Sequence, residues 1–230
     1  MDIILIPGLW LDASSWAPVT KALTDAGHRV DAVTLPGVGE PAATSADIGM
    51  ADWVDAITSR IDAIDGDVVL IGHSGGGNVA WGAADARPDR VTRVIFVDTI
   101  PPAPGRGISE FEIVDGVIPF PGWDFFPEED VHDLDAAIRE RTAPLTRSVP
   151  ARVPSDPLIL ADPQRHTVPA TLLMGAYDQE AFEAEVDDWG PYGEEYRAIK
   201  DVEVIRLDSA HWPQFSQPDR LSRAIFGALG

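Results

Sequence analysis

The sequence contains no cysteine and only two lysines, Lys21 and Lys200, among its 230 residues. The absence of cysteine excludes disulfides, thiolate nucleophiles and cysteine-ligated metals. Apolar residues make up 45% of the chain. No apolar run reaches the roughly 18 residues that a membrane-spanning helix requires. These features predict a soluble globular protein.

Positive charge is also scarce, because 17 basic residues face 38 acidic ones and the net charge is −21. Nucleic acids and anionic membranes attract basic surfaces, so neither is an expected partner. The first residues lack the basic region and the small-residue cleavage site of a secretory signal. Together with the missing cysteine, this predicts a cytoplasmic location. The expected partner is a small-molecule substrate, and the sequence leaves the oligomeric state open.

Residues 68–80 have the pattern of a buried strand, a tight turn and a helix. Gly72 and Gly76 flank Ser74 in the spacing Gly-X-Ser-X-Gly, which is the nucleophile elbow. A serine at the apex of such a turn has strained backbone, and its glycine neighbours let the strand and the helix approach each other. The N-terminus of the following helix favours developing negative charge. We therefore expect Ser74 to be a nucleophile.

Apolar strand-like runs alternate with helical patterns along the chain. The expected strands cover 3–6, 29–35, 68–71, 91–97, 170–174 and 202–207, and the expected helices cover 15–26, 50–64, 75–86 and 218–229. This alternation predicts an α/β fold in which helices cover both faces of a mostly parallel sheet. Ligands bind such sheets where the strands end. Ser74, Asp98, Asp178 and His211 each follow a strand, so we expect them along one edge.

Residues 101–166 differ from the rest of the chain, since 11 of the 20 prolines fall there together with several aromatic residues. We expect one domain, 1–230, with this segment as a cap or lid insertion and with one helix over 128–141. The aromatic residues could pack the insertion onto the body or line a substrate pocket. The candidate pocket residues are Trp10, His73, Phe120, Trp123, Phe125 and Trp212.

A serine hydroxyl needs a histidine as base, and that histidine needs an acceptor that fixes its tautomer. Five histidines are available. His28 precedes an early strand at the opposite edge, His73 points elsewhere in the elbow, and His132 and His166 belong to the insertion. His211, after the last strand, remains as the expected base. The scattered histidines also argue against a metal site, and no cofactor is expected.

Two aspartates could hold His211. Asp178 follows the penultimate strand and provides the chain order Ser, Asp, His that is typical of this architecture. Asp98, at the end of the strand after the elbow, is the alternative acid, unless its carboxylate only shapes its loop. The expected oxyanion hole is formed by the backbone N–H groups of Gly75 and Leu9.

The sequence resembles the α/β-hydrolase fold superfamily over nearly its whole length. The resemblance rests on Gly72-His73-Ser74-Gly75-Gly76, on Asp178 and on Ala210-His211-Trp212-Pro213. It implies a triad of Ser74, Asp178 and His211 and a metal-free hydrolysis through an acyl-enzyme. Compared with the superfamily, the chain begins at the third strand, so about six strands are expected instead of eight.

Within the superfamily, the chain is most similar to the small methylesterase and hydroxynitrile-lyase branch, because residues 7–10 have the spacing of that branch's His-Gly opening. Pro7 replaces the usual histidine of the opening, which removes a supporting side chain. The lyases carry a lysine after the catalytic histidine and a threonine in the oxyanion turn. Here these positions are Trp212 and Gly8, which disfavours cyanohydrin cleavage.

The leading hypothesis is a serine hydrolase that cleaves a carboxylic ester, lactone or similar acyl bond of a small, fairly apolar molecule. One alternative is a non-hydrolytic enzyme on the same scaffold, such as a cofactor-free dioxygenase or a lyase, in which His211 is the base and Ser74 only a hydrogen-bonding group. Another is a ligand-binding receptor that retains the triad. The sequence does not identify the substrate.

Overall fold

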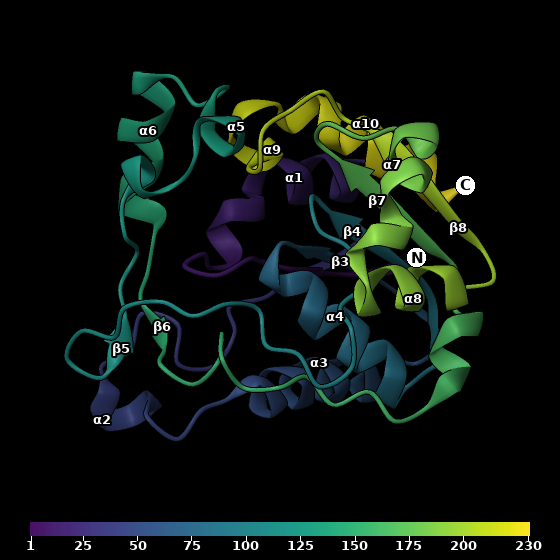
Figure 1. The fold of residues 1–230 in the computed structure, drawn as a ribbon, viewed down its shortest axis with the longest axis horizontal. Helices are drawn as coiled ribbons and strands as arrows, with labels where there is room; N and C mark the ends of the chain where they lie inside the picture. Colours follow the sequence, from purple (N-terminus) through teal and green to yellow (C-terminus); the bar gives the residue numbers. More distant parts are fainter.

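A computed structural model describes all residues, 1–230. Six parallel strands form the central sheet in the order β2-β1-β3-β4-β7-β8 (Figure 1). The strands of this sheet are β1 (Asp2–Ile6), β2 (Arg29–Ala32), β3 (Val68–His73), β4 (Val91–Val97), β7 (Ala170–Met174) and β8 (Val202–Arg206). The predicted α/β architecture with about six strands is confirmed. The second strand is shorter than expected and ends at Ala32 instead of Leu35.

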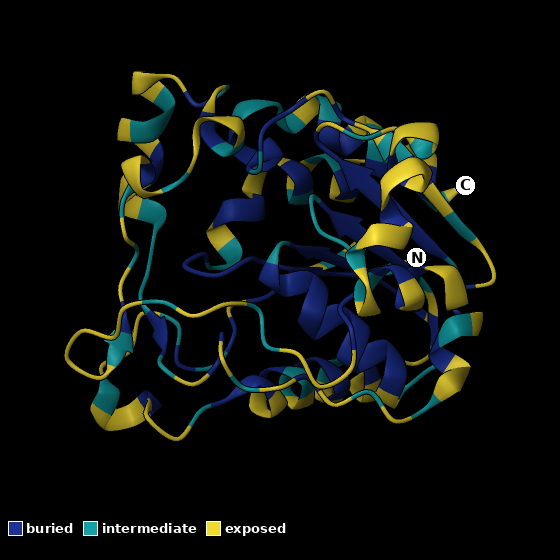
Figure 2. Ribbon diagram, in the orientation of Figure 1, coloured by how far each residue is buried: buried dark blue, intermediate teal, exposed yellow.

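Helices cover both faces of the sheet because alternate residues of each strand point to opposite sides. Ile4 and Ile6 of β1 belong to a large buried cluster with α3 (Met50–Ala63) and α4 (Gly75–Ala86). Ile3 and Leu5 belong to a second cluster with α1 (Ala17–Asp25) and α10 (Pro218–Leu229). Figure 2 shows the central strands of the sheet and α4 as the most deeply buried elements, whereas the edge strands β2 and β8 are partly exposed.

Short helices complete the body of the protein. They are η1 (Ala13–Trp16), α2 (Ala42–Ser45), α7 (Gln179–Glu185), η5 (Val186–Trp189), α8 (Pro191–Ala198) and α9 (Pro213–Ser216). No helix is long and apolar enough to cross a membrane.

The elbow between β3 and α4 requires glycine on both sides of the serine. Ser74 has φ 50° and ψ −126°, a conformation that non-glycine residues rarely adopt. A Cβ at Gly72 would lie 2.5 Å from the Gly76 carbonyl oxygen, and a Cβ at Gly76 would lie 2.5 Å from the carbonyl oxygens of Ile6 and Pro7. Helix α4 can therefore approach β1 and β3 closely only because the residues at positions 72 and 76 have no side chain.

The 101–166 segment connects β4 to β7 and lies mostly outside the sheet (Figure 1). Its elements are β5 (Val117–Ile118), η2 (Trp123–Phe125), α5 (Glu128–Val131), α6 (Ala136–Thr142), η3 (Ala143–Leu145), β6 (Val149–Pro150) and η4 (Pro163–Thr167). The prediction of a single helix over 128–141 is wrong. Asp135 begins α6 as its N-cap, with its carboxylate accepting the Ile138 N–H at 2.7 Å, so the chain forms two short helices.

Candidate active site

Ser74, His211 and Asp98 form a continuous hydrogen-bonded chain. The Ser74 hydroxyl lies 3.0 Å from His211 Nε2, and His211 Nδ1 lies 2.7 Å from Asp98 Oδ2. Because Asp98 accepts a hydrogen bond from Nδ1–H, Nε2 is the unprotonated nitrogen that can accept the serine proton. The arrangement can therefore activate a hydroxyl nucleophile.

The environment of Asp98 keeps its carboxylate ionised. Burial raises the pKa of Asp98, but the hydrogen bond and the charge of His211 and the Gly175 N–H outweigh this effect, and the pKa lies below its usual value. The Gly175 N–H donates to Asp98 Oδ1 at 2.7 Å, so both carboxylate oxygens are engaged. The carboxylate thus has a fixed orientation toward His211.

The expectation that Asp178 contacts His211 is corrected by the structure. Asp178 is exposed and is the N-cap of α7, where its Oδ1 accepts the Ala181 N–H at 2.9 Å. The carboxylate beside His211 belongs to the alternative residue, Asp98.

The strand order explains this outcome. Asp98 follows β4 directly, and β4 lies between the elbow strand β3 and β7. Asp178 comes four residues after Met174, the last residue of β7, and stands at the start of a helix. Both aspartates satisfy the order Ser, Asp, His, so chain order does not separate them. A usable signal was the helix-forming run after Asp178, which is typical of a capping residue.

Leu9 and Gly75, the two residues expected to form the oxyanion hole, lie next to each other beside Ser74. The Leu9 N–H makes no hydrogen bond to the backbone. Gly75 is the first residue of α4, and such N–H groups have no acceptor within the helix. A Cβ at Gly75 would lie 3.2 Å from Leu9 Cγ, so these residues are direct neighbours. Their role as oxyanion donors stays a prediction.

The pocket prediction for His73 is wrong, because this residue is 1% exposed and lies beneath the site. Trp123 and Trp212 are also buried and pack against each other, with ring centroids 5.0 Å apart. Phe120 packs against Trp123 at 4.9 Å. These three aromatic side chains therefore attach the 101–166 segment to the loop that carries His211.

Trp10 and Phe125 line a cavity of about 240 Å³ between the turn after β1 and the 101–166 segment. Its other lining residues are Phe111, Glu112, Val114, Ile118, Pro119 and Pro121. Trp10 has φ 63° and follows Leu9 directly, so the cavity adjoins the turn that carries the Leu9 N–H. The cavity is mainly apolar, and Glu112 is its one ionisable residue.

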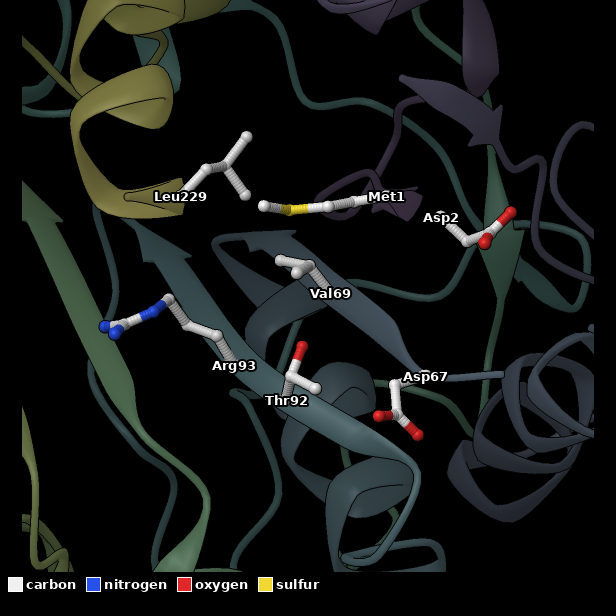
Figure 3. A pocket seen from close by; sticks show the side chains of 7 residues that line it. All are labelled: Met1, Asp2, Asp67, Val69, Thr92, Arg93 and Leu229. Atoms are coloured by element: carbon white, nitrogen blue, oxygen red, sulfur yellow. The ribbon is translucent and has the colours of Figure 1, made fainter. Parts of the chain in front are cut away.

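A larger cavity, of about 400 Å³, lies elsewhere in the molecule (Figure 3). It is lined by Met1, Asp2, Asp67, Val69, Thr92, Arg93 and Leu229. These residues surround the starting ends of β1, β3 and β4, whereas Ser74 and Asp98 follow the other ends. This cavity is therefore separate from the candidate active site.

The remaining histidines lie away from Ser74. The ring of His28 lies tilted beside that of Phe226, with centroids 6.2 Å apart. His132 is exposed and contacts the Glu129 carbonyl oxygen at 3.0 Å. His166 contacts Glu195 at 3.0 Å. Of the five, His211 alone makes a hydrogen bond with the Ser74 hydroxyl.

Three further residues around His211 were not found by the sequence reasoning. Asp130 and Asp133 contact the backbone of the 210–211 loop, and Gln214 contacts His73. No local motif marks these residues, because each acts through a contact between segments far apart in the chain.

Known proteins that are similar to this chain include esterases. The carbendazim hydrolyzing esterase of Nocardioides sp. (strain SG-4G) is 25% identical over 100% of this chain and 99% of its own length. The probable esterase PIR7A of Oryza sativa subsp. indica is 31% identical over an aligned region that covers 62% of this chain and 54% of that protein.

Solved structures share the fold. An extracellular alpha/beta-hydrolase from a Paenibacillus species superimposes with a TM-score of 0.78 at 20% identity, over 99% of this chain and 98% of that one. The methylesterase MES16 from Arabidopsis has a TM-score of 0.74 at 20% identity, over 100% and 98% of the two chains. Residues 3–224 match the model of the alpha/beta hydrolase family. Because this match covers nearly the whole sequence, the chain belongs to the alpha/beta hydrolase family.

Proposed function

We propose that this protein is a serine hydrolase that cleaves a carboxylic ester, lactone or similar acyl bond of a small, fairly apolar molecule. The observation that carries the proposal is the relay from Ser74 through His211 to Asp98, with distances of 3.0 Å and 2.7 Å. In this proposal Asp98, and not Asp178, is the acid of the triad.

The relay supports a two-step acyl transfer. Ser74 Oγ attacks the acyl carbon while His211 Nε2 takes the hydroxyl proton, and the resulting imidazolium donates that proton to the leaving alkoxide. Water then attacks the acyl-enzyme, His211 takes its proton, and the carboxylic acid leaves as Ser74 regains its hydrogen. Asp98 holds the Nδ1 proton and stabilises the imidazolium in both steps.

The backbone N–H groups of Leu9 and Gly75 are the proposed donors to the oxyanion. Backbone donors are already oriented before the reaction, so they stabilise the tetrahedral intermediate without reorganisation. The dipole of α4, whose first residue is Gly75, acts in the same direction. The side chain of Leu9 lies against Gly75 and shapes the entrance to this position.

The cavity beside Trp10 supports an apolar substrate group. Most of its lining side chains are aromatic, aliphatic or proline, and its volume of about 240 Å³ suits a small group. Glu112 in the lining and the net charge of −21 disfavour a negatively charged group there. Similarity to proteins named as esterases, including one that hydrolyses carbendazim, supports acyl-bond hydrolysis.

A fluorophosphonate probe and p-nitrophenyl esters of increasing acyl length test the proposal. The probe should label the protein at Ser74, and Ser74→Ala should abolish labelling and lower turnover at least ~10³-fold. Ser59→Ala, which changes an exposed serine on α3, is the matched control and should behave like the parent.

Folded protein that resists the probe and turns over no ester would contradict the proposal. Retention of activity by Ser74→Ala would favour the non-hydrolytic alternative, in which His211 is the base. One equivalent of product that stays bound to the protein after a single turnover would favour the alternative of a ligand-binding receptor that retains the triad.

A further inference from the structure

The loop that carries His211 is held by the 101–166 segment through two backbone hydrogen bonds. The Ala210 N–H donates to Asp133 Oδ2 at 2.9 Å. The His211 N–H donates to the Asp130 carbonyl at 3.1 Å. The backbone N–H groups of two consecutive residues, one of them the expected base, are thus attached to the 101–166 segment. The two bonds span 77 and 81 residues of the chain.

Side-chain packing strengthens this attachment. Trp212, next to His211, packs edge-to-face against Phe126 with ring centroids 4.7 Å apart and against Trp123 at 5.0 Å. Val131 and Leu134 lie in the same buried cluster, together with Phe215 of α9. The two hydrogen bonds are therefore shielded on one side by an apolar contact.

Asp133 has no evident role in its own segment. Helix α5 ends at Val131, and the N-cap of α6 is Asp135, so Asp133 lies between the two helices and caps neither. Its Oδ1 is buried without a hydrogen-bond partner. Burying an unpaired carboxylate oxygen is unfavourable. The hydrogen bond from Ala210 is the one interaction in the structure that accounts for this position.

The opposite side of the His211 backbone is held from the elbow. His73 Nε2 contacts the His211 carbonyl oxygen at 2.7 Å. The N–H side of the 210–211 backbone thus contacts the 101–166 segment, and its C=O side contacts His73, the last residue of β3. An imidazole that must reach both Ser74 and Asp98 depends on both contacts, because a displacement of about 1 Å in such a group can cost 10²-fold in rate.

We propose that Asp133 is a positioning residue for the base, and that through it the 101–166 segment forms part of the catalytic apparatus. The hydrogen bond from Ala210 to its carboxylate holds His211 where Nε2 reaches Ser74 while Nδ1 reaches Asp98. The inference rests on the proposed function. It also means that a displacement of this segment moves the base as well as the substrate pocket.

Four variants test the inference. Asp133→Ala removes the acceptor, Asp133→Asn retains a carbonyl acceptor of the same reach, and Asp133→Glu keeps the charge but displaces the acceptor. Asp135→Ala, two residues away, removes a similar hydrogen bond that serves only α6. The readouts are kcat and KM for a p-nitrophenyl ester, the rate of fluorophosphonate labelling and the thermal midpoint.

Asp133→Ala and Asp133→Glu should lower kcat by ~10- to 100-fold with little change in KM, and should slow labelling in proportion. Asp133→Asn should retain kcat within a few-fold of the parent. Asp135→Ala should lower the thermal midpoint while kcat stays at the parent value, which separates positioning of His211 from general support of the segment.

Parent-like kcat in Asp133→Glu or in a folded Asp133→Ala would overturn the inference. So would an Asp133→Asn variant as slow as Asp133→Ala, because a retained hydrogen-bond acceptor would then fail to preserve kcat. A parent protein that neither reacts with the probe nor hydrolyses esters would instead count against the proposed function. If Asp133→Ala fails to fold, the Glu and Asn variants decide the question.

Discussion

His73 donates its Nε2 proton to the backbone carbonyl of His211 across 2.7 Å, and the two imidazole rings lie 5.0 Å apart. A carbonyl oxygen only accepts, so Nε2 carries the proton and Nδ1 of neutral His73 is an acceptor. The side-chain amide nitrogen of Gln214 lies 3.3 Å from that Nδ1 and completes the arrangement. A neutral histidine next to the base avoids repulsion when His211 becomes an imidazolium.

The buried state of His73 predicts a loss of stability in acid. Burial, followed by the charge of His211, lowers the pKa of His73 from 6.5 to about 3 in the folded protein. Between these two values the unfolded chain binds the extra proton and the folded chain does not. As the pH drops below 6.5, the pKa of the histidine in the unfolded chain, the contribution of His73 to the free energy of unfolding should therefore fall by about 1.4 kcal/mol per pH unit.

Urea unfolding between pH 4 and pH 7 measures this effect as the difference between the parent and His73→Gln. The difference should narrow as the pH falls, because the variant lacks the titrating ring. His132→Gln, at an exposed position, is the control. Parallel curves for the parent and His73→Gln would show that His73 is protonated in the folded state.

Exchanging each candidate acid for its amide separates Asp98 from Asp178. Asp98→Asn should lower kcat by about 10³- to 10⁴-fold, because an amide no longer enforces the tautomer in which His211 Nε2 accepts the serine proton. Asp178→Asn should leave kcat unchanged, since asparagine is an equally good helix N-cap. Steady-state kinetics on one ester compares the two. A large loss in Asp178→Asn with none in Asp98→Asn would reverse the assignment.

A buried charged cluster joins the elbow helix α4 to η4 and α8. Arg165 and Glu195 are each 5% exposed and form a bidentate pair at 2.7 Å and 2.9 Å. Asp85 of α4 lies 3.2 Å from Arg165, and Trp81 of α4 donates to Glu195 at 2.8 Å. Arg165→Met should lower the free energy of unfolding by about 3 to 5 kcal/mol, because two buried carboxylates lose their countercharge.

Urea unfolding at neutral pH measures this loss, with Arg197→Met as the control. Arg197 pairs with Asp187 at the surface, where both side chains are largely exposed to water, so its replacement should change stability little. Equal effects of the two substitutions would contradict a structural role for the buried cluster.

Local sequence patterns were sufficient to predict the elements that carry the nucleophile and the base. The apolar run before Gly72 and the glycines around Ser74 predict a strand, a strained turn and a helix, since these features depend on neighbouring residues alone. The closing helix, Pro218–Leu229, also has the expected bounds. The break between α5 and α6 was missed, because the acidic start and basic end of 128–141 are typical of a single helix, although the capping residue Asp135 lies inside the range.

The alternating α/β fold and the positions of Ser74 and His211 after their strands follow from the sequence, because hydrophobic periodicity and glycine spacing are local properties. The contact of Asp98 with His211 and the helix-capping position of Asp178 become visible in the folded protein alone. The same holds for the positions of Asp133, His73 and the 101–166 segment around the base. These contacts depend on strand order and on packing between segments far apart in the chain, which neighbouring residues do not encode.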